Sequence, residues 1–239
     1  MKGFGDVYKF EKKKNKKSRF AREKIINQAI HLHLNGNILE ASKQYKYIIN
    51  QGCNDHRVFS NYGAILQGQG KLEEAEKSYR KAIELNPNYA DAQSNLGVML
   101  HDLGKLKEAE KSYRKAIELK PDFVEAHSNL GSILRKLGKL EDAEISTRKA
   151  IELKPDFVEA HSNLGRILRT FGKLEEAEKS YRKAIELNPD FVEAHSNLGS
   201  ILRELGKLED ARICSEKIMD IRSWSILGSY SFNNQLKLD

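Results

Sequence analysis

The stretch VEAHSNLGSILR at residues 124–135 returns as VEAHSNLGRILR at residues 158–169, and again in its first form at residues 192–203. Each copy follows the previous one by 34 residues. A catalytic site is one constellation of side chains, and repeating its parts at a fixed interval does not build such a site. A surface that contacts a long partner does have a use for repetition, so this stretch points first to binding.

The same period extends in both directions from these three copies. Glycine recurs at Gly36, Gly70, Gly104, Gly138, Gly172 and Gly206, and alanine at Ala41, Ala75, Ala109, Ala143, Ala177 and Ala211. These positions define six repeats, at residues 22–55, 56–89, 90–123, 124–157, 158–191 and 192–225. Small residues at fixed offsets in a period of this length predict a stack of helical hairpins, in which each hairpin needs its neighbour to bury its apolar face.

The fourth repeat indicates where its helices begin and end. Asp122 is the expected N-cap, with Glu125 three residues later as in a capping box. Leucines recur at helical spacing until Gly138, which can take the left-handed conformation that ends a helix. The second helix places small and apolar residues on the side expected to face the first helix: Ala143, Thr147, Ala150 and Ile151.

These residues resemble the tetratricopeptide repeat family over residues 22–225. The family's Leu-Gly pair is found at Leu96-Gly97, Leu130-Gly131, Leu164-Gly165 and Leu198-Gly199, its aromatic residue at Tyr45, Tyr79, Tyr113 and Tyr181, and its closing proline at Pro87, Pro121, Pro155 and Pro189. The sequence departs from the family pattern at the early tryptophan, replaced by His127, His161 and His195, and at the aromatic residue, replaced by Thr147 and Ser215. The resemblance implies an all-α, right-handed superhelical solenoid of six helix-turn-helix repeats.

Asparagine occupies one first-helix position in all six repeats: Asn27, Asn61, Asn95, Asn129, Asn163 and Asn197. It is a poor residue for a helix interior, because its side chain competes for backbone hydrogen bonds. Its primary amide presents two donors and one acceptor, which can match a peptide unit of any sequence. Two interpretations stay open: the amides bind a peptide, or each amide bonds to a neighbouring helix.

The segment AHSNLG is also similar to repeats of the O-linked N-acetylglucosamine transferases. The resemblance implies that the first helices line the concave side of the superhelix and that the asparagine column grips peptide backbone there. In those enzymes the repeats precede a catalytic domain, and this chain stops before one. We therefore expect a binding protein, or a substrate-recruiting accessory of a separate, glycosyltransferase-like enzyme.

Charged residues accompany the asparagines in the last three repeats. Glu125, Glu159 and Glu193 lie near the start of the first helix, and Arg135, Arg169 and Arg203 near its end, with Arg166 in mid-helix. The arginines suit carboxylate or phosphate groups. Acid at the start and base at the end of a helix also complement its dipole, but this does not explain Arg166. The predicted peptide-binding set is therefore the six asparagines with Arg135, Arg166, Arg169 and Arg203, and partners with acidic groups are expected.

Composition limits the class of protein and its location. The chain of 239 residues is 39% hydrophobic, which is enough for a soluble core. It has neither the apolar core of a signal peptide nor a membrane-spanning run. Cys53 and Cys214 are far apart along the array, so neither a disulfide nor a zinc site is expected. We predict a cytoplasmic protein.

Catalytic machinery is absent from the sequence pattern. His127, His161 and His195 occur once per repeat, about 10 Å apart if helix layers stack normally, which is too far for one shared metal ion. No phosphate-binding loop or nucleophile elbow is present. We predict no enzyme activity, no cofactor and no small-molecule substrate. The mixed charges of segments such as EEAEKSYRKAIEL predict a solvated outer face for the second helices.

The two ends differ from the array. Residues 1–21 form a basic arm, and residues 1–24 contain ten Lys or Arg against three Asp or Glu, which accounts for the net charge of +7. The arm is expected to be a disordered, solubilising tail, with nucleic-acid or acidic-membrane binding as the alternative. Residues 226–239, together with Trp224, are apolar enough to cap the last repeat or to dock a partner.

Overall fold

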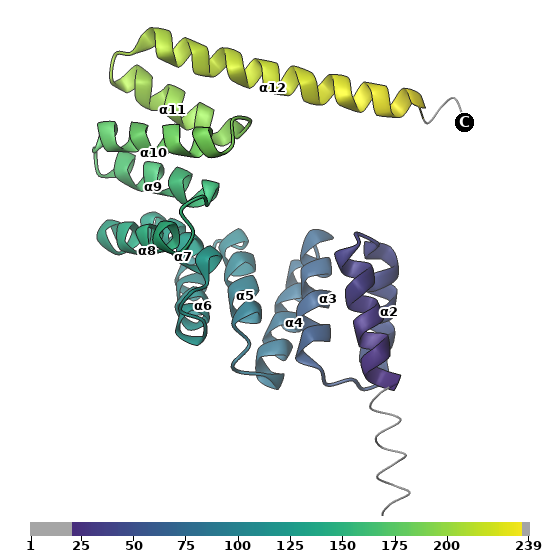
Figure 1. The fold of residues 1–239 in the computed structure, drawn as a ribbon. Helices are drawn as coiled ribbons and strands as arrows, with labels where there is room; N and C mark the ends of the chain where they lie inside the picture. The colour runs from purple at the N-terminus through teal and green to yellow at the C-terminus, as the bar shows by residue number, and fades with distance from the viewer. Residues whose placement is uncertain (1–20, 236–239) are drawn as a thin grey trace, which may run out of the picture. The chain divides into compact units, whose positions relative to one another are not determined.

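The structure, a computed structural model, describes residues 21–235, with side chains described for residues 21–223. The chain divides into two compact units, Met1–Lys105 (unit 1) and Leu106–Asp239 (unit 2). Each unit is a series of α-helices joined by short turns (Figure 1). The described residues contain no β-strand, and their helices follow one another as helix-turn-helix pairs. This confirms the predicted all-α fold.

In unit 1, helical residues 21–34 precede α2 (Ile38–Asn50), α3 (His56–Gly68), α4 (Leu72–Leu85) and α5 (Ala90–Asp102). Unit 2 contains α6 (Leu106–Leu119), α7 (Val124–Lys136), α8 (Leu140–Leu153), α9 (Val158–Thr170), α10 (Leu174–Leu187), α11 (Val192–Glu204) and α12 (Leu208–Gln235). The division between the units lies in the turn between α5 and α6, the two helices of the third predicted repeat.

The turns within the hairpins depend on glycine, as the sequence predicts. Gly138 has a φ of 76°, and its N–H donates to the carbonyl of Arg135 at 3.0 Å. The next N–H, of Lys139, donates to the carbonyl of Leu134 at 2.9 Å. Only glycine adopts this conformation without strain, so its recurrence at the same offset fixes the length of every first helix.

The predicted N-cap of α7 is wrong. Phe123, not Asp122, is the N-cap residue, and no side chain caps the helix. Asp122 lies in the turn after Pro121, where the N–H of Phe123 donates to the carbonyl of Lys120 at 3.1 Å. Because this turn places the first helical residue at Val124, the aspartate stands one position too early to cap the helix.

Close packing between the two helices of a hairpin requires small residues at the contact. In the α7–α8 hairpin, Ala143, Thr147 and Ala150 are fully buried, as predicted for the inner side of α8. A Cβ atom at Gly131 would lie 2.0 Å from the Thr147 hydroxyl oxygen. The next pair repeats the arrangement with Tyr181, which is buried between α9, α10 and α11 in one apolar cluster: Leu164, Leu168, Ala177, Tyr181, Leu198, Ile201, Leu202, Ala211 and Cys214.

The first helices form one side of unit 2. Helices α7, α9 and α11 pack closely against one another in series, whereas the backbones of α8 and α10 lie further apart and are joined by an ion pair between Arg148 and Glu176 at 3.9 Å. Side chains that point away from the second helices of this unit therefore share a continuous surface on α7, α9 and α11. The same relation holds in unit 1 for α3 and α5, which also contact each other.

The ends of the predicted array fall largely outside the described residues. The basic arm, apart from Ala21, is not described, and neither are the side chains of the capping segment, Trp224 included. The backbone of α12 is helical through to Gln235, so the helix that opens the second half of the sixth repeat continues past residue 225. Capping by the last segment stays a prediction.

Candidate functional site

The asparagine column lies on the first helices, but its members differ in their contacts. Asn163 on α9 is bonded inside the protein, because its amide nitrogen donates to the hydroxyl of Ser128 on α7 at 2.8 Å. Its amide oxygen accepts a hydrogen bond from a guanidinium nitrogen of Arg166 at 2.6 Å. Of the two interpretations of the asparagine column, Asn163 therefore fits the second, in which the amide bonds to a neighbouring helix.

Three other members of the column have no such partners. Within the described part of the chain, the amides of Asn95, Asn129 and Asn197 make no side-chain hydrogen bond. All three side chains are half-buried, whereas Asn27 is exposed. The amides of Asn129 and Asn197 can therefore pair with a ligand without first breaking a contact.

Three of the predicted arginines come together in unit 2. Arg135, Arg166 and Arg169 line a cavity of about 320 Å³, which Thr170, Tyr181 and Asn197 complete. We call this the arginine pocket. Arg203, the fourth predicted arginine, is exposed and does not line it. Sequence reasoning therefore found three residues of the pocket and Asn197, but missed Thr170 and Tyr181.

The arginines of the pocket differ in how they are neutralised. Arg166 pairs with Glu193 on α11 at 3.0 Å and also donates to Ser132 on α7 at 3.4 Å. Arg169 pairs with Glu204 at the end of α11. Together with Asn163, these contacts link α7, α9 and α11.

Two groups in the pocket have perturbed acidity. Burial, and then the charge of Arg166, lowers the pKa of Arg135. Burial raises the pKa of the Tyr181 hydroxyl, although the three arginines oppose this increase. At neutral pH the tyrosine is therefore protonated and is a hydrogen-bond donor beside three cations.

Comparison with known families identifies the repeat. Models of the tetratricopeptide repeat match residues 55–122, 124–157, 147–179, 165–206 and 192–223. The chain carries tetratricopeptide repeats. A search of curated proteins found no match to the sequence.

Solved structures share the fold. PilF of Pseudomonas aeruginosa matches with a TM-score of 0.73 at 16% identity, over 91% of this chain and 98% of that one. MamA from Desulfovibrio magneticus RS-1 matches with a TM-score of 0.62 at 21% identity, over 70% of this chain and 95% of that one. YrrB, described as a TPR protein with an unusual peptide-binding site, has a TM-score of 0.58 at 25% identity, over 79% of this chain and 97% of that one.

The histidines at the tryptophan position of the tetratricopeptide repeat have a structural contact in common. His127, His161 and His195 each donate from Nε2 to the carbonyl of the proline six residues earlier, at 2.8–2.9 Å. The carbonyl can only accept, so the ring must carry its proton on Nε2. Each histidine ties the turn between two repeats to the next first helix.

Among the described residues, no group of three or more His, Cys, Asp or Glu side chains could hold a metal ion.

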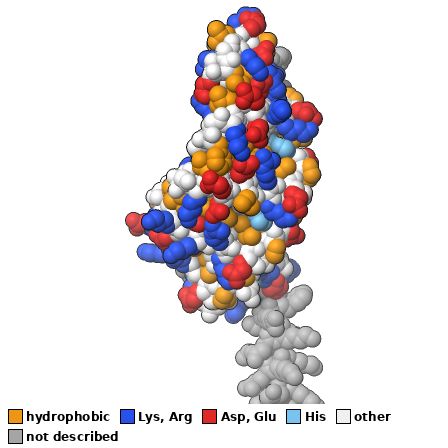
Figure 2. Space-filling view, turned by 90° about the vertical axis from the view of Figure 1, so that its left-hand side faces the viewer, with side chains coloured by type: hydrophobic (Ala, Val, Ile, Leu, Met, Phe, Trp, Pro, Cys, Tyr) orange, Lys and Arg blue, Asp and Glu red, His pale blue; other side chains and the backbone are white. Residues whose placement is uncertain are grey.

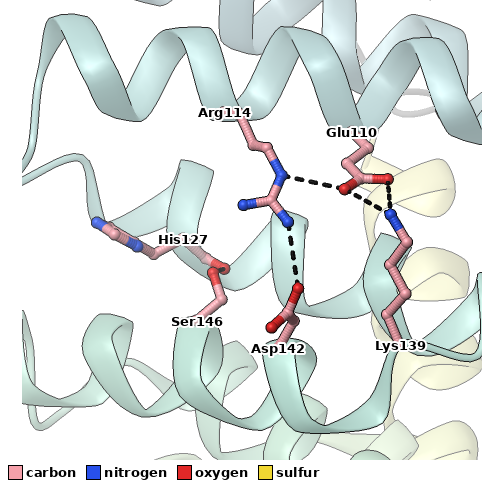
Figure 3. Close-up of polar contacts among 6 residues, drawn as sticks. All are labelled: Glu110, Arg114, His127, Lys139, Asp142 and Ser146. Carbon is pink, nitrogen blue, oxygen red and sulfur yellow. Dashed lines mark hydrogen bonds and ion pairs between the residues drawn. The ribbon is translucent and has the colours of Figure 1, made fainter.

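The second helices of the tetratricopeptide repeats carry ion pairs on their outer side, as predicted, and these pairs also bridge repeats (Figure 3). Glu110 on α6 accepts from Arg114 at 3.0 Å and from Lys139, which precedes α8, at 2.8 Å. Arg114 reaches Asp142 on α8 at 3.4 Å. Glu178 repeats this arrangement with Arg182 and Lys207. Figure 2 shows basic and acidic side chains interleaved over one face of the molecule.

The same outer side holds an apolar hollow that sequence reasoning did not find. A groove of about 710 Å³ lies between α6, α7 and α8, and its floor includes Leu130 and Leu134. Ile145, which is 69% exposed, lines it at a position where four of the other repeats have lysine and the sixth has Ile213. Its lining includes the ion-paired Arg114 and Asp142, and His127, whose ring bonds to the carbonyl of Pro121. In the part of the chain that the structure describes, no helix has the length and apolar character needed to cross a lipid bilayer.

Proposed function

We propose that this chain is a non-catalytic scaffold that binds an extended peptide segment along the first helices of unit 2. Asn129 on α7 and Asn197 on α11 would bond to the peptide backbone, with α9 between them. The observation that carries the proposal is the contrast within the column: Asn163 is satisfied by Ser128 and Arg166, whereas the amides of Asn129 and Asn197 have no partner among the described residues.

The physical basis is the match between a primary amide and a peptide unit. One amide can donate to a backbone carbonyl and accept from a backbone N–H, so binding tolerates many peptide sequences. Each net hydrogen bond contributes about 0.5–1.5 kcal/mol, against the free energy needed to order the peptide. The described peptide-binding site of YrrB, which is 25% identical over 79% of this chain, supports the proposal.

The test compares two changes within the same column. We expect Asn129→Ala with Asn197→Ala to weaken peptide binding about tenfold or more, because two ligand contacts are lost. The melting temperature should not fall, since alanine is the better helix former. Binding would be measured by fluorescence anisotropy with peptides selected by the wild-type chain from a random library.

Asn163→Ala is the matched control. This change removes the donor to the buried hydroxyl of Ser128 and one of the acceptors of Arg166, so we expect it to destabilise unit 2 by about 1–3 kcal/mol in denaturant unfolding. The proposal is overturned if the double variant binds the selected peptides as tightly as wild type, or if it loses as much stability as Asn163→Ala.

A further inference from the structure

The arginine pocket contains a buried hydroxyl that has lost the acceptor found in an equivalent repeat. In unit 1, the hydroxyl of Tyr79 donates to the amide oxygen of Gln67 at 3.0 Å. The corresponding pair in unit 2, displaced by three periods of 34 residues, is Tyr181 and Arg169. Both tyrosines are almost completely buried, but arginine has no acceptor atom. The hydroxyl of Tyr181 therefore makes no hydrogen bond among the described residues.

Two further hydrogen-bond donors of the pocket also lack an acceptor. The Nε atoms of Arg135 and Arg166 are buried and have no hydrogen-bond partner in the described part of the chain. A buried donor without an acceptor destabilises the folded state, because it has lost its hydrogen bond to water. The pocket thus gathers three groups that can donate, and no side chain in it accepts from them. What these three donors lack is a hydrogen-bond acceptor, which a ligand could provide.

The charges around the pocket indicate what kind of acceptor fits. Glu193 neutralises Arg166, and Glu204 neutralises Arg169. Arg135 has no carboxylate partner among the described residues, so one positive charge is left over. A singly charged group balances this surplus, whereas a doubly charged phosphate exceeds it.

We propose that the arginine pocket binds one carboxylate group of the ligand, either an acidic side chain or the C-terminal carboxylate of a peptide. The two oxygens of a carboxylate match the planar donor edge of a guanidinium, and each has a further lone pair for the tyrosine hydroxyl. This inference rests on the proposed peptide binding for the source of the carboxylate. The pocket itself can be tested without a peptide.

The first experiment follows the Nε–H groups of Arg135 and Arg166 by ¹H–¹⁵N NMR, with the two signals assigned from the variants Arg135→Gln and Arg166→Gln. The probes are sodium acetate and sodium phosphate, each compared with sodium chloride at the same ionic strength. We expect acetate to shift the Arg135 and Arg166 signals saturably, and Arg135→Gln to abolish the response of Arg166. Signals that do not respond to acetate, or that respond more strongly to phosphate, overturn the proposal.

Arg169→Gln separates a binding role from a structural one. This variant rebuilds the Gln67–Tyr79 pair in unit 2, so the hydroxyl of Tyr181 regains an acceptor. We expect its melting temperature to equal or exceed that of wild type, while its affinity for acetate falls about tenfold. Arg148→Gln, which removes an exposed arginine paired with Glu144 on α8, is the matched control and should leave acetate binding unchanged. Unchanged acetate affinity in Arg169→Gln would contradict the pocket.

Peptides then distinguish the two sources of the carboxylate. The probes are three versions of one selected peptide: a central glutamate with an amidated end, a central glutamine with an amidated end, and a central glutamine with a free C-terminal carboxylate. We expect Arg135→Gln to weaken only the versions that carry a carboxylate. If the response to acetate persists while the Asn129→Ala, Asn197→Ala double variant binds peptide normally, peptide binding by the asparagine column is overturned and the pocket stands. Equal binding of all three versions by wild type and Arg135→Gln overturns the pocket alone.

Discussion

Gly165→Ala is expected to destabilise unit 2 by about 1–3 kcal/mol, the usual cost of inserting a methyl group into a well-packed core. Gly165 lies inside α9, where a Cβ atom would be 2.8 Å from two ring atoms of Tyr181. That ring is fully buried and held by α9, α10 and α11, so it has little room to move. Urea unfolding followed by circular dichroism would measure the loss.

Gly199→Ala provides the matched control at the equivalent position of the next repeat. Its Cβ atom would meet the Cβ of Cys214 at 3.4 Å, because Ser215 replaces the tyrosine there. Alanine is favoured over glycine in a helix by up to about 1 kcal/mol, so this variant should be neutral or stabilising. Equal destabilisation by the two substitutions would show that backbone preference, rather than contact with Tyr181, decides the effect.

Glu110→Gln combined with Glu178→Gln should remove about 2–4 kcal/mol of stability at neutral pH, or about 1–2 kcal/mol for each hydrogen-bonded carboxylate. Each side chain is only 11% exposed and bridges two repeats. For Glu178, the hydrogen bond from Lys207 is the largest effect on its pKa, and with that from Arg182 it outweighs burial, so the pKa lies below its ordinary value of 4.5. For Glu110, burial is the largest single effect, but the hydrogen bonds and the positive charges of Lys139 and Arg114 together outweigh it, so the pKa is lowered.

The sign of these shifts fixes the pH dependence. A carboxylate whose pKa is lowered by folding contributes its full stability above the unfolded pKa, and loses it as the pH falls through the folded pKa. The difference between wild type and the double variant should therefore be constant from pH 7 to about pH 5 and disappear at lower pH. Unfolding curves at a series of pH values test this, and a difference that persists at pH 2 would contradict the electrostatic origin.

The sequence period was sufficient to predict the helical hairpins and their turns, because each depends on residues close together in the chain. Gly138 ends α7 through its own backbone conformation. Asp122 misled the prediction of the N-cap, because a capping residue is effective at one position only and the turn after Pro121 makes Val124 the first helical residue. Local sequence signals therefore predicted which segments are helical better than they predicted the residue at which each helix begins.

The candidate site could be predicted only in part, because the repeats are alike in sequence but differ in their neighbours. Asn163 and Asn197 occupy the same position, yet Arg166 lies one turn from Asn163, whereas Ser200 takes its place beside Asn197. The hydroxyl of Tyr181 lacks an acceptor because Arg169 stands where Gln67 does in the second repeat. Comparing each tyrosine with the residue twelve positions earlier would have found this difference from the sequence.

The unsatisfied hydroxyl of Tyr181 links occupancy of the pocket to the lifetime of the folded chain. A ligand that binds only the native state raises the free energy of unfolding by RT ln(1 + [L]/Kd). A ligand concentration one hundred times Kd therefore adds about 2.7 kcal/mol. Proteases cleave such proteins mainly through their transiently opened states, whose population falls by the same factor. A chain that carries its ligand would therefore be degraded more slowly than one that does not, and its abundance would follow the supply of the ligand.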